Sequence, residues 1–166
     1  ALERAKQAGI PSDVLVRREV PTQEAYDEAL IGKLEAAGTD LVILAGFLTI
    51  ISETVVNRFE NRIINVHPSL IPSFCGEGYY GLRVHEEALC RGVKVTGATV
   101  HFVNNVCDGG PIILQRAVEV QDGDTPETLQ KRVMEEAEWK LLPKAAALFC
   151  EGRLSVENGV VHCREE

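Results

Sequence analysis

An amide and an imidazole stand two residues apart in the stretch NVHPSLIP, where Asn65 and His67 are followed by Pro68 and Pro72. Residues i and i+2 of a strand share a face, so both side chains are expected together at the end of one strand. An amide can donate a hydrogen bond to an oxygen that gains negative charge, and an imidazole can donate a second one or pass a proton. The pair therefore suits attack on a carbonyl group, although a lone histidine is more often structural.

A carboxylate follows in the stretch CDGGP, where Asp108 lies in a tight turn that its two glycines permit. On composition alone this residue is a turn former. The functional alternative is a carboxylate that raises the pKa of His67 by charge pairing and relays a proton. The sequence does not show whether Asp108 and His67 meet.

Other chemistries fit the sequence less well. Ser69 is not set in a G-x-S-x-G elbow, which argues against a serine hydrolase. The stretch GEGYYG lies in a long loop and is a weak signal for phosphate binding. No H-x-x-x-H, H-E-x-x-H or C-x-x-C spacing occurs among the histidines and cysteines, namely His67, His85, His101, His162, Cys75, Cys90, Cys107, Cys150 and Cys163. We therefore expect no metal site and reduced thiols.

Strand and helix patterns alternate along the chain. Strands are expected over residues 13–16, 41–46, 62–67, 95–103 and 111–120. Helices are expected at LERAKQAGI and over residues 22–37, 52–59, 82–91 and 125–150, the second beginning at an N-cap Thr22 and ending at Gly38. The run LVILAG indicates a strand buried on both faces, and a hairpin turns at Asn158–Gly159. The pattern predicts an α/β fold with a mostly parallel open sheet and helices on both faces.

Three stretches follow strands of this predicted sheet: AGFLTII, NVHPSLIP and NNVCDGG. In open α/β sheets, ligands bind beyond the carboxyl ends of the strands. All three stretches are therefore expected to converge on one cleft.

Composition narrows the class of partner. The 166 residues include 17 Lys and Arg against 25 Asp and Glu, a formal net charge of −8 without a basic cluster. That balance argues against binding of a nucleic-acid backbone. No apolar run is long enough to span a bilayer and no signal segment opens the chain. A small-molecule role in the cytoplasm, without a membrane partner, is the expectation.

The pairing of N-x-HPSLIP with GATVHFV-x-x-x-x-DGGP resembles the folate-dependent formyltransferases. The resemblance runs from LERAKQAGI through AGFL and DGGPIILQ to the closing hairpin, so residues 1–166 are expected to form a single domain with the Rossmann-like formyltransferase fold. Within the family it is closest to members that move a formyl group from 10-formyltetrahydrofolate to the amine of glycinamide ribonucleotide (GAR) in purine biosynthesis. Formyl-folate is then a co-substrate, and no metal is implied.

The resemblance implies roles for individual residues. Asn65, His67 and Asp108 match the catalytic triad. Asn65 and His67 would stabilise the oxyanion, and Asp108 would hold His67 protonated and assist proton movement from the amine to the leaving nitrogen. Pro68 and Glu138 match contacts to GAR, although Glu138 also reads as a solvated helix residue. The implied folate contacts are Leu48, Thr49, Ile50, Ile51, Asn65, Asn104, Asn105, Val106, Cys107 and Asp108, of which residues 48–51 also read as a plain apolar segment.

The chain departs from the family pattern at several points. Thr49 and Gln23 stand where relatives often have Arg, and Cys107 stands where an aliphatic residue is common. Family members begin with a strand and a glycine-rich turn for the GAR phosphate, roughly forty residues that this sequence lacks. The fold is therefore expected to be N-terminally incomplete, with weak GAR binding and a free sheet edge through which a homodimer could form.

Three alternative functions are considered for the same residues. A 10-formyltetrahydrofolate hydrolase shares the triad, but such relatives tend to read H-H-S where this chain has His67 and Pro68. A methionyl-tRNA formyltransferase would need a C-terminal RNA-binding domain. A non-catalytic fragment that keeps the folate pocket is the third.

Overall fold

Two compact units make up the chain, residues 1–39 and residues 40–166. The computed structural model describes residues 1–47 and 51–164. The first unit contains helix α1 (Leu2–Gln7), the 3-10 turn η1 (Arg17–Glu19) and helix α2 (Gln23–Ala36). The second contains β1 (Val42–Leu44), α3 (Glu53–Arg58), β2 (Ile63–His67), α4 (Leu82–Cys90), β3 (Val95–Phe102), β4 (Ile112–Glu119), α5 (Pro126–Val133), the π-helical turn η2 (Met134–Glu138), α6 (Trp139–Cys150), β5 (Leu154–Glu157) and β6 (Val160–Cys163). A single domain over residues 1–166 stays a prediction.

The first unit is helical, and the ends of α2 are capped as the sequence predicts. Thr22 caps α2 by accepting a hydrogen bond from the Ala25 N–H at 3.1 Å, and Gly38 follows the helix with a φ of +64°. The predicted strand over residues 13–16 is wrong, since this segment is irregular. Residues 1–39, all of which the structure describes, contain no strand with which it could pair.

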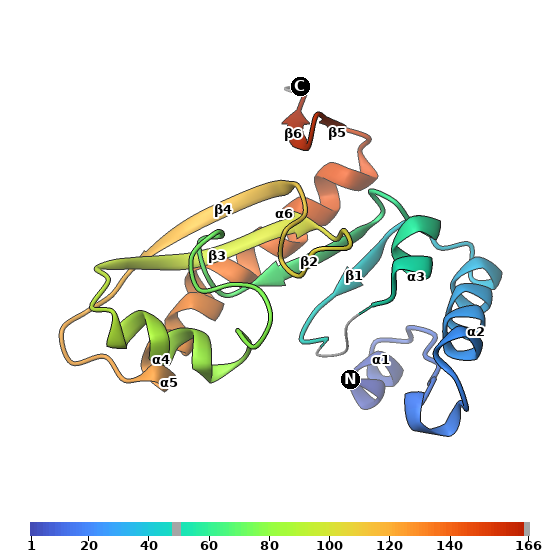
Figure 1. The fold of residues 1–166 in the computed structure, drawn as a ribbon, viewed down its shortest axis with the longest axis horizontal. Coiled ribbons are helices and arrows are strands. Elements are labelled where there is room, and N and C mark those ends of the chain that lie inside the picture. Colours follow the sequence, from blue (N-terminus) through green and yellow to red (C-terminus); the bar gives the residue numbers. More distant parts are fainter. Residues whose placement is uncertain (48–50, 165–166) are drawn as a thin grey trace. The chain divides into compact units, whose positions relative to one another are not determined.

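A four-stranded sheet in the order β1-β2-β3-β4 forms the centre of the second unit (Figure 1). The α/β class is confirmed. The strand directions differ from the predicted mostly parallel pattern: in the described part of the chain β1 and β2 are parallel, whereas β2–β3 and β3–β4 are antiparallel. A parallel neighbour needs a crossover of a dozen residues or more, and the connection over residues 103–111 between β3 and β4 is too short for one.

Strand β1 corrects a second expectation. It covers three residues and pairs only with β2 among the described strands. Its central residue, Ile43, is 44% exposed, so the predicted burial on both faces is wrong. In the described sheet β1 also lies at an edge, so one of its backbone edges has no strand partner there.

The core lies between one face of the sheet and the helices that follow β4. Ile64 of β2 packs there with Ala98, Val100 and Phe102 of β3. Helix α6 contacts both β3 and β4 and runs behind them in Figure 1. The helical partners in this cluster are Leu129, Val133, Ala137, Leu141 and Ala145. Burial of these apolar side chains fixes the helices against the sheet.

The helix predicted over residues 125–150 is interrupted by a π-helical turn. Thr125 caps its start, η2 separates α5 from α6, and Pro143 lies inside α6. Proline has no N–H to donate to the preceding turn, so α6 continues past Pro143 with one backbone hydrogen bond fewer. Over residues 1–47 and 51–164, no helix combines the length and apolar character that crossing a bilayer requires.

The closing hairpin agrees with the prediction. Strands β5 and β6 pair antiparallel, and Val156 lies opposite Val161. Asn158 and Gly159 have φ values of 50° and 78°. Two successive positive φ values are typical of the tight turn that Asn-Gly favours between two strands.

Candidate active site

Four polar residues lie on the face of β2 and β3 opposite the apolar core. In the antiparallel register, Asn65 pairs with His101 and His67 pairs with Thr99. Directly opposite residues in such a pair point to the same face. His67, Thr99 and His101 are each at most 4% exposed, so the sheet holds a buried polar surface there.

Asp108 reaches this surface from the loop between β3 and β4. The side chain of Asn104 shapes the loop: its Oδ1 accepts from the Val106 N–H at 3.0 Å, and its Nδ2 donates to the Gly109 carbonyl at 3.2 Å. Asp108 has a φ of +53°, which aspartate tolerates better than most residues. A Cβ on Gly110 would lie 1.8 Å from the Phe102 carbonyl oxygen, so only glycine lets the loop approach β3 this closely.

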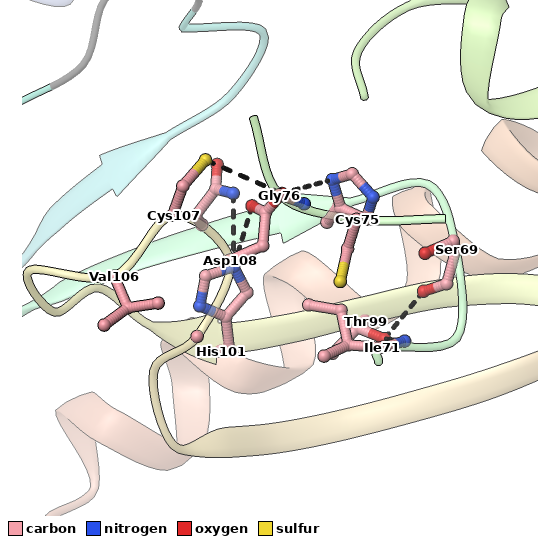
Figure 2. Close-up of polar contacts among 12 residues, drawn as sticks. Ser69, Ile71, Cys75, Gly76, Thr99, His101, Val106, Cys107 and Asp108 are labelled. Carbon is pink, nitrogen blue, oxygen red and sulfur yellow. Dashed lines mark hydrogen bonds and ion pairs between the residues drawn. The ribbon is translucent and has the colours of Figure 1, made fainter. Parts of the chain in front are cut away.

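The carboxylate of Asp108 joins three groups. Its Oδ2 lies 3.3 Å from His67 Nδ1 and accepts a hydrogen bond from the Gly76 N–H at 2.9 Å. Its Oδ1 lies 3.6 Å from His101 Nε2. Figure 2 shows Asp108 between the His101 ring and the backbone at Gly76. Asp108 and His67 therefore meet, a contact that the sequence pattern left open and the family resemblance implied.

Asn65 enters the cluster through His101. The Asn65 Nδ2 lies 3.3 Å from His101 Nε2, and His101 Nδ1 lies 2.8 Å from the Phe102 carbonyl oxygen. A carbonyl oxygen only accepts, so Nδ1 carries a hydrogen. The Nε2 of a neutral His101 accepts from Asn65, whereas the Nε2 of a protonated His101 donates to Asp108 Oδ1. The amide of Asn65 therefore presents its nitrogen to His101 and carries a second N–H that can donate elsewhere.

His67 is held between two acceptors. Its Nδ1 faces Asp108, and its Nε2 lies 2.9 Å from the Phe74 carbonyl oxygen. Burial lowers the pKa of His67; the Phe74 carbonyl and the Asp108 carboxylate raise it, but the net pKa stays below the ordinary value. The expectation that Asp108 raises the pKa of His67 is right for that pair, but burial outweighs it. Whether Asp108 holds His67 protonated during the reaction stays a prediction.

Asp108 itself is held in the ionised form. Burial raises the pKa of its carboxyl. The His101 contact, the Gly76 N–H and the two neighbouring imidazoles lower this pKa, and together they outweigh burial. The net pKa lies below the ordinary value for aspartate. The site thus pairs a carboxyl whose pKa is lowered by its neighbours with an imidazole whose pKa is lowered by burial.

The other predicted binding residues are less connected. Leu48, Thr49 and Ile50 lie outside the described residues, and Ile51 is half-buried. Asn105, Val106 and Cys107 are exposed in the loop before Asp108, with the Cys107 Sγ 4.0 Å from Asp108 Oδ2. Their contact with folate stays a prediction.

The two predicted substrate contacts lie at different elements. Pro68 is half-buried directly after His67. Glu138 is the last residue of η2 and is also half-buried, and burial raises the pKa of its carboxyl. Their contact with GAR stays a prediction.

Three groups of the cluster were missed by sequence reasoning. His101 could have been found from the alternation in VTGATVHFV, which places it on the same face as Thr99. The Phe74 carbonyl and the Gly76 N–H carry no sequence signal, because every residue type supplies a carbonyl and almost every one supplies an N–H.

The cluster consists of groups that donate or accept hydrogen bonds. In the part of the chain that the structure describes, no three His, Cys, Asp or Glu side chains are arranged to hold a metal ion. The five cysteines are free thiols. The arrangement combines an amide donor, two imidazoles and a carboxylate, which suits stabilisation of an oxyanion and movement of a proton.

Known proteins match the chain over nearly its whole length. The family model described as formyl transferase matches residues 1–146. The phosphoribosylglycinamide formyltransferase of Escherichia coli is 40% identical over 95% of this chain and 71% of its own length. The trifunctional purine biosynthetic protein adenosine-3 of Bos taurus is 45% identical over 95% of this chain and 15% of its own length. Glycinamide ribonucleotide transformylase 1 from Symbiobacterium toebii superimposes with a TM-score of 0.91 at 44% identity, covering 99% of this chain and 74% of that structure.

Proposed function

The chain belongs to the formyl transferase family, and from that premise we propose that it transfers a formyl group from 10-formyltetrahydrofolate to the amine of GAR. It spans about 15% of the cattle relative and 71% of the Escherichia coli relative. The observation that carries the proposal is the cluster of Asn65, His67, His101 and Asp108 on one sheet face. A formyl carbon attacked by an amine needs these groups: donors for the oxygen and an acceptor for the proton.

The amine would attack the formyl carbon to give a tetrahedral intermediate with a negatively charged oxygen. The second N–H of Asn65 is a donor for this oxygen, because the first is directed at His101. His67 would supply positive charge beside it. Since burial keeps the pKa of His67 low in the resting site, the imidazolium is favoured only as the oxyanion forms, and the stabilisation is specific to that state.

Asp108 would handle the amine proton. Its carboxylate is ionised and can take the proton that the amine nitrogen loses once it has bonded to the formyl carbon and become acidic. It also contacts His67 Nδ1, so the Asp108–His67 pair can share this proton until Asp108 gives it to the leaving nitrogen of the folate. The Gly76 N–H fixes the oxygen that faces His67. Asp108 is therefore proposed as the proton carrier and His67 as the oxyanion partner.

The proposal places formyl-folate against the loop of residues 104–108. Val106 there is 63% exposed, and an exposed apolar side chain beside a buried carboxylate is suited to cover an aromatic ring system. Glu138 and Pro68 are proposed to contact GAR, as the family resemblance implies.

The test mixes the purified protein with 10-formyltetrahydrofolate and GAR and follows formation of tetrahydrofolate and formyl-GAR. We expect both products in equal amounts, with no tetrahydrofolate when GAR is omitted. Release of formate without GAR would show that water is the acceptor and that the protein is a hydrolase. Folate binding without turnover would show a binding protein and contradict the proposal.

A further inference from the structure

The backbone segment from Pro68 to Gly76, here called the Pro68–Gly76 loop, contacts both acid–base residues of the site. The Phe74 carbonyl oxygen lies 2.9 Å from His67 Nε2, and the Gly76 N–H donates to Asp108 Oδ2 at 2.9 Å. Both contacts use main-chain atoms. The placement of His67 and Asp108 therefore depends on what holds this loop in position.

Two cross-strand neighbours of the sheet hold the loop. Thr99 of β3 and Gln115 of β4 lie opposite each other. Gln115 Nε2 donates to the Ile71 carbonyl oxygen at 3.0 Å and to Thr99 Oγ1 at 3.0 Å. The Ile71 N–H donates to Thr99 Oγ1 at 3.1 Å, and that hydroxyl donates to the Ser69 carbonyl oxygen at 2.7 Å. Figure 2 shows Thr99 below the loop, bonded to Ser69.

The hydrogen-bonding capacity of Thr99 fixes the direction of the Gln115 amide. A hydroxyl has one donor and two acceptor sites, and Thr99 uses the donor on Ser69 and one acceptor site on Ile71. The remaining site accepts from Gln115, as does the Ile71 carbonyl. Both partners of Gln115 are acceptors, so a replacement can keep these bonds only if its side chain donates hydrogen bonds.

The rest of the loop is tied to itself. Ser69, which is fully buried, donates from Oγ to the Ser73 carbonyl at 2.5 Å, and the Ser73 N–H donates to the Leu70 carbonyl at 3.0 Å. A displacement at Ile71 is therefore transmitted to the residues next to Phe74. Among the side chains of Ser69, Thr99 and Gln115, only that of Gln115 is exposed. It can therefore be replaced without opening a cavity.

We propose that Gln115 is a positioning residue for formyl transfer: its amide holds the Pro68–Gly76 loop so that Phe74 and Gly76 keep His67 and Asp108 in place. The proposal rests on the proposed function for its kinetic part. Its structural part, the link from Gln115 to His67, does not. Gln115 touches none of the reacting atoms and acts through the loop.

The test compares Gln115→Met and Gln115→Glu, which keep the side-chain length and lose the N–H donor, with Arg116→Met as the control. Arg116 is the next residue of β4, is exposed, and has its side chain on the other face of the strand. Urea unfolding checks that each variant is folded. We expect kcat to fall about tenfold in both Gln115 variants, the effect of losing one or two neutral hydrogen bonds, with KM within about twofold because Gln115 does not contact substrate.

A second readout follows the histidine ring of His67 by NMR as the pH is varied. The Phe74 carbonyl raises the pKa of His67, so the uncharged variant Gln115→Met should titrate at lower pH than the parent protein, and Arg116→Met should match the parent. An unchanged titration would overturn the proposal, as would an unchanged kcat or an equal loss in Arg116→Met. If the parent protein transfers no formyl group, the proposed function fails, while the titration still reports whether Gln115 positions His67.

Discussion

The two faces of strand β3 have different roles, and the residues of the two faces alternate along the strand. Ala98, Val100 and Phe102 belong to the apolar core cluster that packs against the helices. Thr99 and His101 point the other way, and each uses its polar atoms on specific partners. The first face contributes stability through burial of apolar side chains. The second face holds buried polar side chains in the arrangement that the proposed reaction needs. Mutations on the two faces should therefore separate stability from turnover.

Phe102→Ala should have the largest effect on stability. The ring is 2% exposed and meets Phe149 edge-on, with centroids 6.4 Å apart. Removing a buried ring leaves a cavity, and the free energy of unfolding should fall by about 4 kcal/mol. Urea unfolding at pH 7 measures this. A loss below about 1 kcal/mol would mean that the core face is not what holds the sheet to its helices.

Asp108→Asn should have the opposite signature. Asparagine can still accept from the Gly76 N–H, but it has no charge to stabilise an imidazolium or take up a proton. We expect kcat to fall by about 10³-fold, with a smaller change in the unfolding midpoint than Phe102→Ala produces. Steady-state kinetics and urea unfolding on the same samples give both numbers. If kcat stayed near that of the parent protein, Asp108 would have no part in proton transfer.

The same contrast explains what the sequence could predict. The sequence pattern predicted a strand over residues 95–103 and a helical segment over residues 125–150, because burial on one face needs only residues of the right type at the right period. The meeting of His67 with Asp108 was open in the pattern itself and came only from the family resemblance.

Where the sequence prediction was wrong or incomplete, the missing information was about neighbours. Residues 13–16 have strand-like composition, yet no strand lies beside them in their unit. The apolar run at β1 looks like a central strand, yet it lies at an edge in the described sheet. The contacts of His67 with Phe74 and of Asp108 with Gly76 use backbone atoms, which sequence patterns do not distinguish.

A smaller effect is expected at His85 of α4, where a polar group is buried without serving the site. His85 is 0% exposed, and neither ring nitrogen has a hydrogen-bond partner among the described residues. Burial, with a smaller contribution from His67, lowers its pKa to about 4. The unfolded chain takes up a proton near pH 6.5 and the folded chain only near pH 4, so the free energy of unfolding falls as the pH drops through this window.

His85→Leu removes that proton uptake and should flatten the pH dependence. Between pH 7 and pH 4.5 the parent protein should lose on the order of 2 kcal/mol more than the variant. His67, whose pKa is also lowered, remains in both proteins and contributes the same sign, so the variant keeps a residual slope. Urea unfolding at pH 7, 5.5 and 4.5 measures the difference, with His162→Leu at an exposed position of β6 as the control. Parallel curves for parent and His85→Leu would show that His85 takes up its proton in the folded state, and the contrast between the faces of the sheet would then not extend to α4.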